Sequence, residues 1–131
     1  MGMPAAKHGD QVIATDIHIV LIQAPPSPPI PVPVPHSFTG IIDGNLSQNV
    51  LIEGMPAATV DSTATNQPSH IPQGGPFQKS PSNKATINMG SATVNINGKK
   101  AARNGDTAIT CNDPSDMPIG KVIAAGIVLV G

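Results

Sequence analysis

Short runs of β-branched and other apolar residues, each closed by a glycine, recur along the chain. "NVLIEG" ends at Gly54, "TVNING" ends at Gly98 and "GIVLVG" ends at Gly131. The first two are followed by "MPAATVDS" and "KKAARNGD", which share an Ala-Ala pair. A short β-branched run, a glycine and a second extended segment are typical of a β-hairpin with a tight turn. The pattern therefore predicts hairpins turned at Gly54 and Gly98.

The two ends of the chain each carry half of this unit. Gly2–Asp10, "GMPAAKHGD", has the Ala-Ala segment without a strand before it, and 126–131 is a strand without that segment after it. We expect these halves to pair, so that three hairpin repeats close into a ring and hide their edges. The apolar stretch 121–131 resembles a buried helix, but Gly126 and its β-branched neighbours favour strands. The predicted fold is all-β with a pseudo-threefold arrangement and few or no helices.

A proline-rich stretch separates the first two repeats. Gln23–Phe38, "QAPPSPPIPVPVPHSF", contains seven prolines. Proline excludes helix and weakens strand pairing, so we expect a long, stiff, extended connection. Such a strut would carry the chain to the apex of the domain and end there at His36. Two alternatives are a linker and a ligand for a proline-binding domain, which would make the protein an adaptor.

The composition indicates a domain with a thin core. The chain has 131 residues, of which 11% are charged and two are aromatic. A small domain of this kind needs a staple, and a single cysteine excludes an internal disulfide, so the staple is a metal or a partner. The seven basic residues form no large cluster, which argues against nucleic-acid binding. The N-terminus has no apolar signal core, so we expect synthesis in the cytoplasm without a signal peptide.

The repeats deliver metal-binding side chains in a shared register. "AAKHGDQVIATDIH" ends at His18, and "AATVDSTATNQPSH", of equal length, ends at His70. The third repeat, "AARNGDTAITC", ends at Cys111. His36 closes the proline run and can supply a fourth ligand. Three imidazoles and one thiolate suit a closed, tetrahedral, structural Zn²⁺ site, with Fe²⁺ as the second choice of metal.

Other chemistry finds less support in the sequence. His8 lies inside the first repeat and is interpreted as structural or solvated, and Asp10 and Asp106 occupy matching turn positions. No Ser-His-Asp signature or phosphate-binding loop occurs, and Glu53 is the sole glutamate. A small zinc metalloenzyme with three histidine ligands and an open position remains an alternative to a structural site.

The repeats resemble those of a known family. "VLIEGMPAATVDS" and "VNINGKKAARNGD" are similar to PAAR-repeat proteins, named for the motif Pro-Ala-Ala-Arg. Pro-Ala-Ala occurs at Pro4–Ala6 and Pro56–Ala58, and Ala-Ala-Arg occurs at Ala101–Arg103 after Lys100. The resemblance covers nearly the whole chain. The proline-rich insertion resembles that of a subgroup found in contractile injection systems.

The resemblance implies a conical tip rather than an enzyme. Family members sharpen a trimeric spike, the protein called VgrG in type VI secretion, and sit on its blunt end as monomers. The expected function is a membrane-puncturing tip of a type VI or phage-tail-like machine. Its partners are then the spike, the target membrane transiently, and effectors. We expect one PAAR-repeat domain over 1–131 with no effector extension, assembled on the spike and ejected from the cell or into the target.

The resemblance also implies an apical zinc ion bound by histidines and a cysteine. The family's first ligand follows the first Gly-Asp, which matches His18 after Asp10, and the last ligand matches Cys111 after Asp106. The implied ligand set is His18, His36, His70 and Cys111. His36 departs from the pattern because it lies in an insertion that the shortest family members lack.

Overall fold

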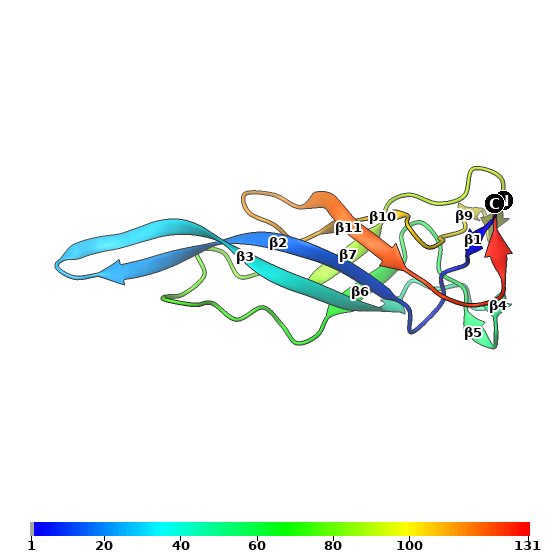
Figure 1. The fold of residues 1–131 in the computed structure, drawn as a ribbon, viewed down its shortest axis with the longest axis horizontal. Coiled ribbons are helices and arrows are strands. Elements are labelled where there is room, and N and C mark those ends of the chain that lie inside the picture. The colour runs from blue at the N-terminus through cyan, green and yellow to red at the C-terminus, as the bar shows by residue number, and fades with distance from the viewer. Residues whose placement is uncertain (1) are drawn as a thin grey trace.

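The protein consists of β-strands joined by turns and loops. The computed structural model describes residues 2–131 and contains twelve strands and no helix within that range (Figure 1). All strand pairs between these elements are antiparallel. The prediction of an all-β fold is therefore confirmed. Residues 2–131 contain no helix long and apolar enough to span a bilayer.

Six of the strands close into a barrel in the order β10-β11-β2-β3-β6-β7. Their bounds are Gln11–Ala24 for β2, Ser27–Gly44 for β3, Thr63–Asn66 for β6, Lys84–Ile87 for β7, Thr107–Thr110 for β10 and Met117–Ile123 for β11. In β6 and β10 every second residue is buried, as expected for strands with one face toward a core. Within the barrel, closure leaves the short strands β6, β7 and β10 without open edges.

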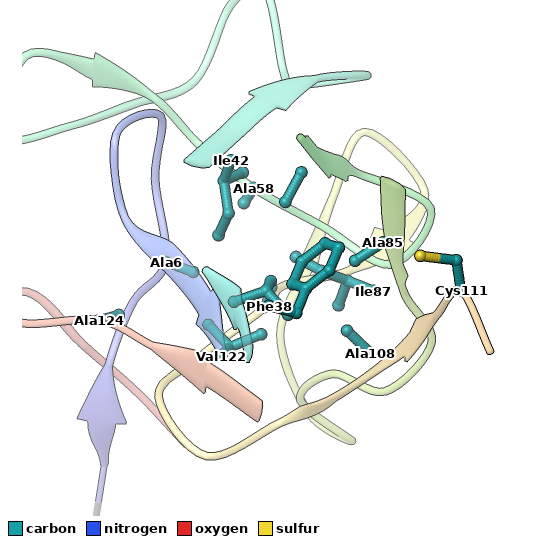
Figure 2. Packing of buried hydrophobic residues seen from close by; sticks show 13 residues of the cluster. Ala6, Phe38, Ile42, Ala58, Ala85, Ile87, Ala108, Cys111, Val122 and Ala124 are labelled. Carbon is teal, nitrogen blue, oxygen red and sulfur yellow. The ribbon is translucent and has the colours of Figure 1, made fainter. Parts of the chain in front are cut away.

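The barrel core is built around Phe38, which is 1% exposed (Figure 2). Ile42, Ile87 and Val122 are also fully buried in this cluster, and most of its other members are alanines. Gly40 makes room for the ring, since a Cβ at this position would lie 2.7 Å from Phe38 Cε1. One aromatic ring therefore fills the centre of a core that is otherwise built from alanines and a few aliphatic side chains.

The other six strands form three two-stranded pairs at one end of the molecule (Figure 1). They are β1 (Met3–Pro4) with β12 (Leu129–Val130), β4 (Leu51–Ile52) with β5 (Met55–Pro56), and β8 (Asn95–Ile96) with β9 (Lys99–Lys100). The pairing of β1 with β12 confirms that the C-terminal strand is the partner of the N-terminal segment. The turns of the other two pairs have positive φ at Glu53-Gly54 and Asn97-Gly98, as the predicted tight turns require.

The Ala-Ala pairs connect the three repeats through a closed ring of hydrogen bonds. The N–H of Ala6 donates to the carbonyl of Ala102 at 2.9 Å, Ala102 donates to Ala58 at 3.0 Å, and Ala58 donates to Ala6 at 3.0 Å. All three side chains are 0% exposed. Each segment thus satisfies its neighbour's backbone groups, and no larger side chain has room between them.

The predicted turn role of the two matching aspartates is confirmed. Asp10 accepts the backbone N–H of Lys7 at 3.1 Å, and Asp106 accepts that of Arg103 at 2.8 Å. Ser62 takes the same part in the second repeat by accepting the N–H of Thr59 at 2.9 Å. These contacts close the same type of turn in each repeat.

The proline-rich stretch is extended, as predicted, but it is paired as a strand, and the prediction of a separate strut that ends at His36 was wrong. It forms most of β3, which pairs with β2 from Gln11↔Ile41 to Ala24↔Ser27. Beyond the barrel the two strands continue as a hairpin arm that projects away from the three strand pairs (Figure 1). The chain therefore turns at the end of the arm and returns along it, and His36 lies where the arm meets the barrel.

The register explains how this strand accommodates its prolines. Pro31, Pro33 and Pro35 stand opposite Leu21, Ile19 and Ile17 of β2. These three β2 residues direct their N–H groups away from β3, to Pro76 O, Asp113 Oδ2 and Asn112 Oδ1 at 2.7–2.8 Å. In an antiparallel ladder, two residues that face each other either both direct their N–H groups at the partner strand or both direct them away from it. The nitrogens of the three prolines therefore point away from β2, as the N–H groups of the facing β2 residues point away from β3. The prolines thus remove N–H donors from the free edge of β3.

Restoring these donors is expected to make the arm associate with other copies. The variant Pro31→Thr/Pro33→Thr/Pro35→Thr regains three outward N–H groups on a long edge strand, which is a template for strand addition. Sedimentation should show association that increases with concentration, whereas Pro72→Thr, in an exposed loop, should stay like the wild type. A triple variant that remains as monodisperse as the wild type would contradict this role.

Candidate metal centre

Four side chains with metal-binding atoms meet at the end of the barrel from which the arm projects. Asp16 and His18 come from β2, Cys111 directly follows β10, and His70 follows β6 by a few residues. One donor atom of each lies within 4.8 Å of the others, so the group could hold a metal ion. All four are buried or nearly so. Three of the four ligands expected from the sequence are thus brought together.

His36 lies against the other two histidines without being part of that four-residue group. Its ring centroid is 5.6 Å from that of His18 and 5.3 Å from that of His70, and the rings of His18 and His70 are 5.0 Å apart. In the strand register it stands directly opposite Asp16. His8, the remaining histidine, does not belong to the cluster of donors.

Two ring nitrogens in this cluster are buried and have no hydrogen-bond partner: His18 Nδ1 and His36 Nε2. The other nitrogen of His36, Nδ1, lies 2.9 Å from the carbonyl of Val34 and can donate to it, which leaves a lone pair on Nε2. Buried polar atoms are usually satisfied, so such a nitrogen needs a partner. A metal ion among the histidines would supply one to His36, and the donor set therefore fits a bound metal.

Asparagines hold His70 in place. Asn83 Oδ1 accepts the backbone N–H of His70 at 2.8 Å, and Asn66 Nδ2 lies 3.3 Å from His70 Nδ1. Asn66 is itself fixed, because its Oδ1 accepts the N–H of Thr39 at 2.8 Å. His70 Nε2 is the nitrogen turned toward the cluster, where it lies 3.0 Å from Asp16 Oδ2.

Asp16 is the residue that the sequence analysis missed. It is 0% exposed, and its Oδ1 accepts the hydroxyl of Thr110 at 2.6 Å. Thr110 in turn accepts Asn112 Nδ2 at 3.1 Å, and Asn112 Oδ1 accepts the N–H of Ile17 at 2.7 Å. One signal in the sequence could have found it. Asp16 and His18 are two positions apart in a predicted strand, and alternate side chains of a strand share a face.

Burial sets the protonation of the metal-free site. It is the main cause that raises the pKa of the Cys111 thiol, and the charge of Asp16 adds to it. Burial also lowers the pKa of His18, and the neighbouring His70 adds to this effect. Without a metal, the site therefore favours a neutral thiol and a neutral imidazole. A bound cation would instead favour the thiolate form of Cys111, since coordination deprotonates a thiol.

Two aromatic rings pack against the histidines of the site. Phe77 lies 5.8 Å from His18 and 5.4 Å from His36 between ring centroids, and Phe38 of the barrel core lies 6.1 Å from His70. Phe77 is attached to the arm by a backbone bridge to Val20. The two rings therefore cover part of the histidine cluster with apolar surface.

A fold of short hairpins joined through Ala-Ala segments, with a buried histidine and cysteine cluster at one end, is consistent with a spike-tip protein. The family model for the PAAR motif matches residues 33–114, which is more than half of the chain. The chain therefore belongs to the PAAR motif family, whose members are generally structural spike tips rather than enzymes. No curated protein matches the sequence significantly.

Proposed function

We propose that the chain is the metal-stabilised tip of a contractile injection apparatus, of the type VI or phage-tail-like kind, and caps a trimeric VgrG-like β-helical spike. The observation that carries this proposal is the match to the PAAR motif family. Binding to the tip of VgrG is what membership of this family implies in general. The tip is made in the cytoplasm, assembled on the spike and ejected with it.

The end of the molecule with the three strand pairs has features suited to a trimeric partner. In each pair one strand has the same order, an exposed residue and then a buried one: Leu51-Ile52, Asn95-Ile96 and Leu129-Val130. The three buried residues form a second core with Ala5, Ala57 and Ala101. Three similar units around a closed ring of hydrogen bonds support a pseudo-threefold base, with each unit meeting one chain of the trimer.

This end also exposes apolar side chains. Ile127 is 89% exposed, Leu51 is 60% exposed and Leu129 is 59% exposed. Large apolar residues grouped at one end of a small domain often mark a contact with another protein. We assign these residues to the spike contact.

The metal lies at the other end of the barrel, where the hairpin arm begins. We propose that His18, His36, His70 and Cys111 bind a structural Zn²⁺, with Fe²⁺ as the second choice. The metal would link strands β2 and β3 with the segments that follow β6 and β10, where the barrel is too thin for a large core. Its chemistry there is cross-linking of the chain, and rigidity at this end serves to puncture the target membrane.

Binding to the spike tests the proposal, with purified chain and a trimeric VgrG-like β-helix. We expect one chain per trimer by mass measurement. Leu51→Asp/Leu129→Asp should weaken binding by about 30-fold or more, because it places charges in the centre of the contact. Ile71→Asp, which changes an equally exposed residue after β6 (68%), should bind like the wild type. No binding, or three chains per trimer, would contradict the proposal.

A further inference from the structure

We propose that Asp16 is a ligand of the same metal and belongs to its inner cluster with His18, His70 and Cys111. His36, whose donor atom lies outside that cluster, approaches on metal binding to give five donors: three imidazoles, one thiolate and one carboxylate. This inference rests on the proposed function only in requiring that the cluster bind a metal. The inference adds Asp16, which does not occupy any of the aligned repeat positions that identified His18, His70 and Cys111. The oxygen concerned is Oδ2, because Oδ1 is held by the hydroxyl of Thr110 at 2.6 Å.

The spacing of the donor atoms of Asp16, His18, His70 and Cys111 agrees with ligands of one ion. Asp16 Oδ2 lies 3.0 Å from His70 Nε2 and 3.5 Å from Cys111 Sγ, and Cys111 Sγ lies 3.6 Å from His18 Nε2. Zinc binds nitrogen and oxygen at about 2.0–2.2 Å and sulfur at about 2.3 Å, so neighbouring ligands of one ion are about 3–3.6 Å apart. Asp16 therefore stands at ligand distance from both a nitrogen and a sulfur donor.

Asp16 lies among the donors rather than behind one of them. A carboxylate that only orients a ligating histidine contacts the ring nitrogen that faces away from the metal. Here the nitrogen of His70 that faces away from the cluster is Nδ1, and Asn66 is its neighbour. Asp16 contacts Nε2, the nitrogen on the cluster side, and the same oxygen also faces Cys111.

Asp113 shows the contrasting arrangement. Its Oδ2 lies 3.7 Å from His18 Nδ1, whereas the other nitrogen of His18 faces Cys111. This carboxylate therefore stands behind His18, in the position of an orienting group, and also accepts the N–H of Ile19 at 2.8 Å. The two buried acids of the site are thus expected to differ in role.

The charge of Asp16 also calls for a cation. In residues 2–131 no lysine or arginine forms an ion pair with this fully buried carboxylate, whose partner is His70. A buried carboxylate without a cation is costly. The carboxylate and the thiolate together carry two negative charges, which a divalent ion neutralises, so the buried site then has no net charge. The carboxylate oxygen is a hard ligand in the chemical sense, which makes the donor set suitable for Fe²⁺ as well as for Zn²⁺.

Cobalt substitution tests the assignment through the visible spectrum. Five-coordinate Co²⁺ absorbs more weakly in the visible range than four-coordinate Co²⁺, so the wild-type protein should show weak bands. Asp16→Asn should bind Co²⁺ at least about tenfold less tightly, since the loss of even an outer partner has this effect, and its bands should be stronger. Asp43→Asn, the matched control, changes an exposed carboxylate of β3 outside the site and should keep both the affinity and the weak bands of the wild type.

X-ray absorption at the metal edge of the wild-type protein provides a second readout that does not depend on how the variant folds. We expect one sulfur and four nitrogen or oxygen neighbours. One sulfur and three lighter neighbours, together with strong Co²⁺ bands in both wild type and Asp16→Asn, would overturn the role of Asp16 and leave the proposed tip intact. If the wild-type protein bound no Co²⁺ or Zn²⁺, the metal centre of the proposed function would itself be wrong.

Discussion

Cys111→Ser is expected to weaken metal binding strongly, because it removes the one soft ligand, and to lower the free energy of unfolding by several kcal/mol. Structural zinc contributes on the order of 10 kcal/mol to the folding of small domains, and the thiolate is the softest ligand of this site. Calorimetry with metal analysis should show a metal-depleted protein with a lower Tm. Treatment of the wild type with a chelator should give a similar Tm, because both changes remove the same cross-link.

The control for this substitution is Ser115→Ala, an exposed residue in the loop after Cys111, which should keep its metal and its Tm. The experiment also separates a structural centre from a small zinc metalloenzyme. A catalytic site with three histidine ligands and an open position would retain its metal when Cys111 is replaced. A Cys111→Ser protein with full metal content and an unchanged Tm would therefore contradict a structural role.

Phe38→Ala is expected to cost about 3–5 kcal/mol of stability, the usual range for a buried phenylalanine. The loss should fall at the upper end of this range because Phe38 is the one large ring in a core lined mainly by alanines (Figure 2). Small neighbours cannot collapse far into the space that the ring leaves. Urea unfolding monitored at saturating Zn²⁺ should show a lower midpoint with metal still bound.

Phe77→Ala provides the comparison for this second prediction. Phe77 is partly exposed and lies outside the barrel cluster, against His18 and His36. Its replacement should cost less stability than that of Phe38. Equal losses for the two variants would mean that the barrel core does not depend on its central ring as we describe.

Much of the fold could be predicted from the sequence because its turns are local. The positive φ values at Gly54 and Gly98 are conformations that glycine adopts readily, and both glycines directly follow β-branched runs. The pairing of the two chain ends could be predicted because each end carried half of a repeated unit. The equal spacing of His18 and His70 within their repeats likewise anticipated their meeting in the structure.

The arm could not be predicted from the general rule that proline weakens strand pairing. The rule applies where an N–H is needed, and in β3 the prolines Pro31, Pro33 and Pro35 occupy positions whose nitrogens face the free edge. Their spacing of two residues was the signal for a strand, since it matches the alternation of a β-ladder. Recognising it required the partner strand, which the proline run itself does not reveal.

Asp16 was missed because it lies outside the register that aligned the repeats. The second and third repeats have no acid at the corresponding place, so a comparison of repeats passes over it. Its position is unusual only in the context of its strand, where it shares the inward face with Val12, His18 and Val20. A carboxylate on a buried face needs a partner, and that partner could be identified only once the strands were placed together.

The number of metal ions per chain tests the central claim most directly. Elemental analysis of protein purified without chelators should give one zinc or iron ion per chain. A chain that contains no metal, takes up neither Zn²⁺ nor Fe²⁺ and is nevertheless fully folded would contradict the account of a metal-stabilised tip.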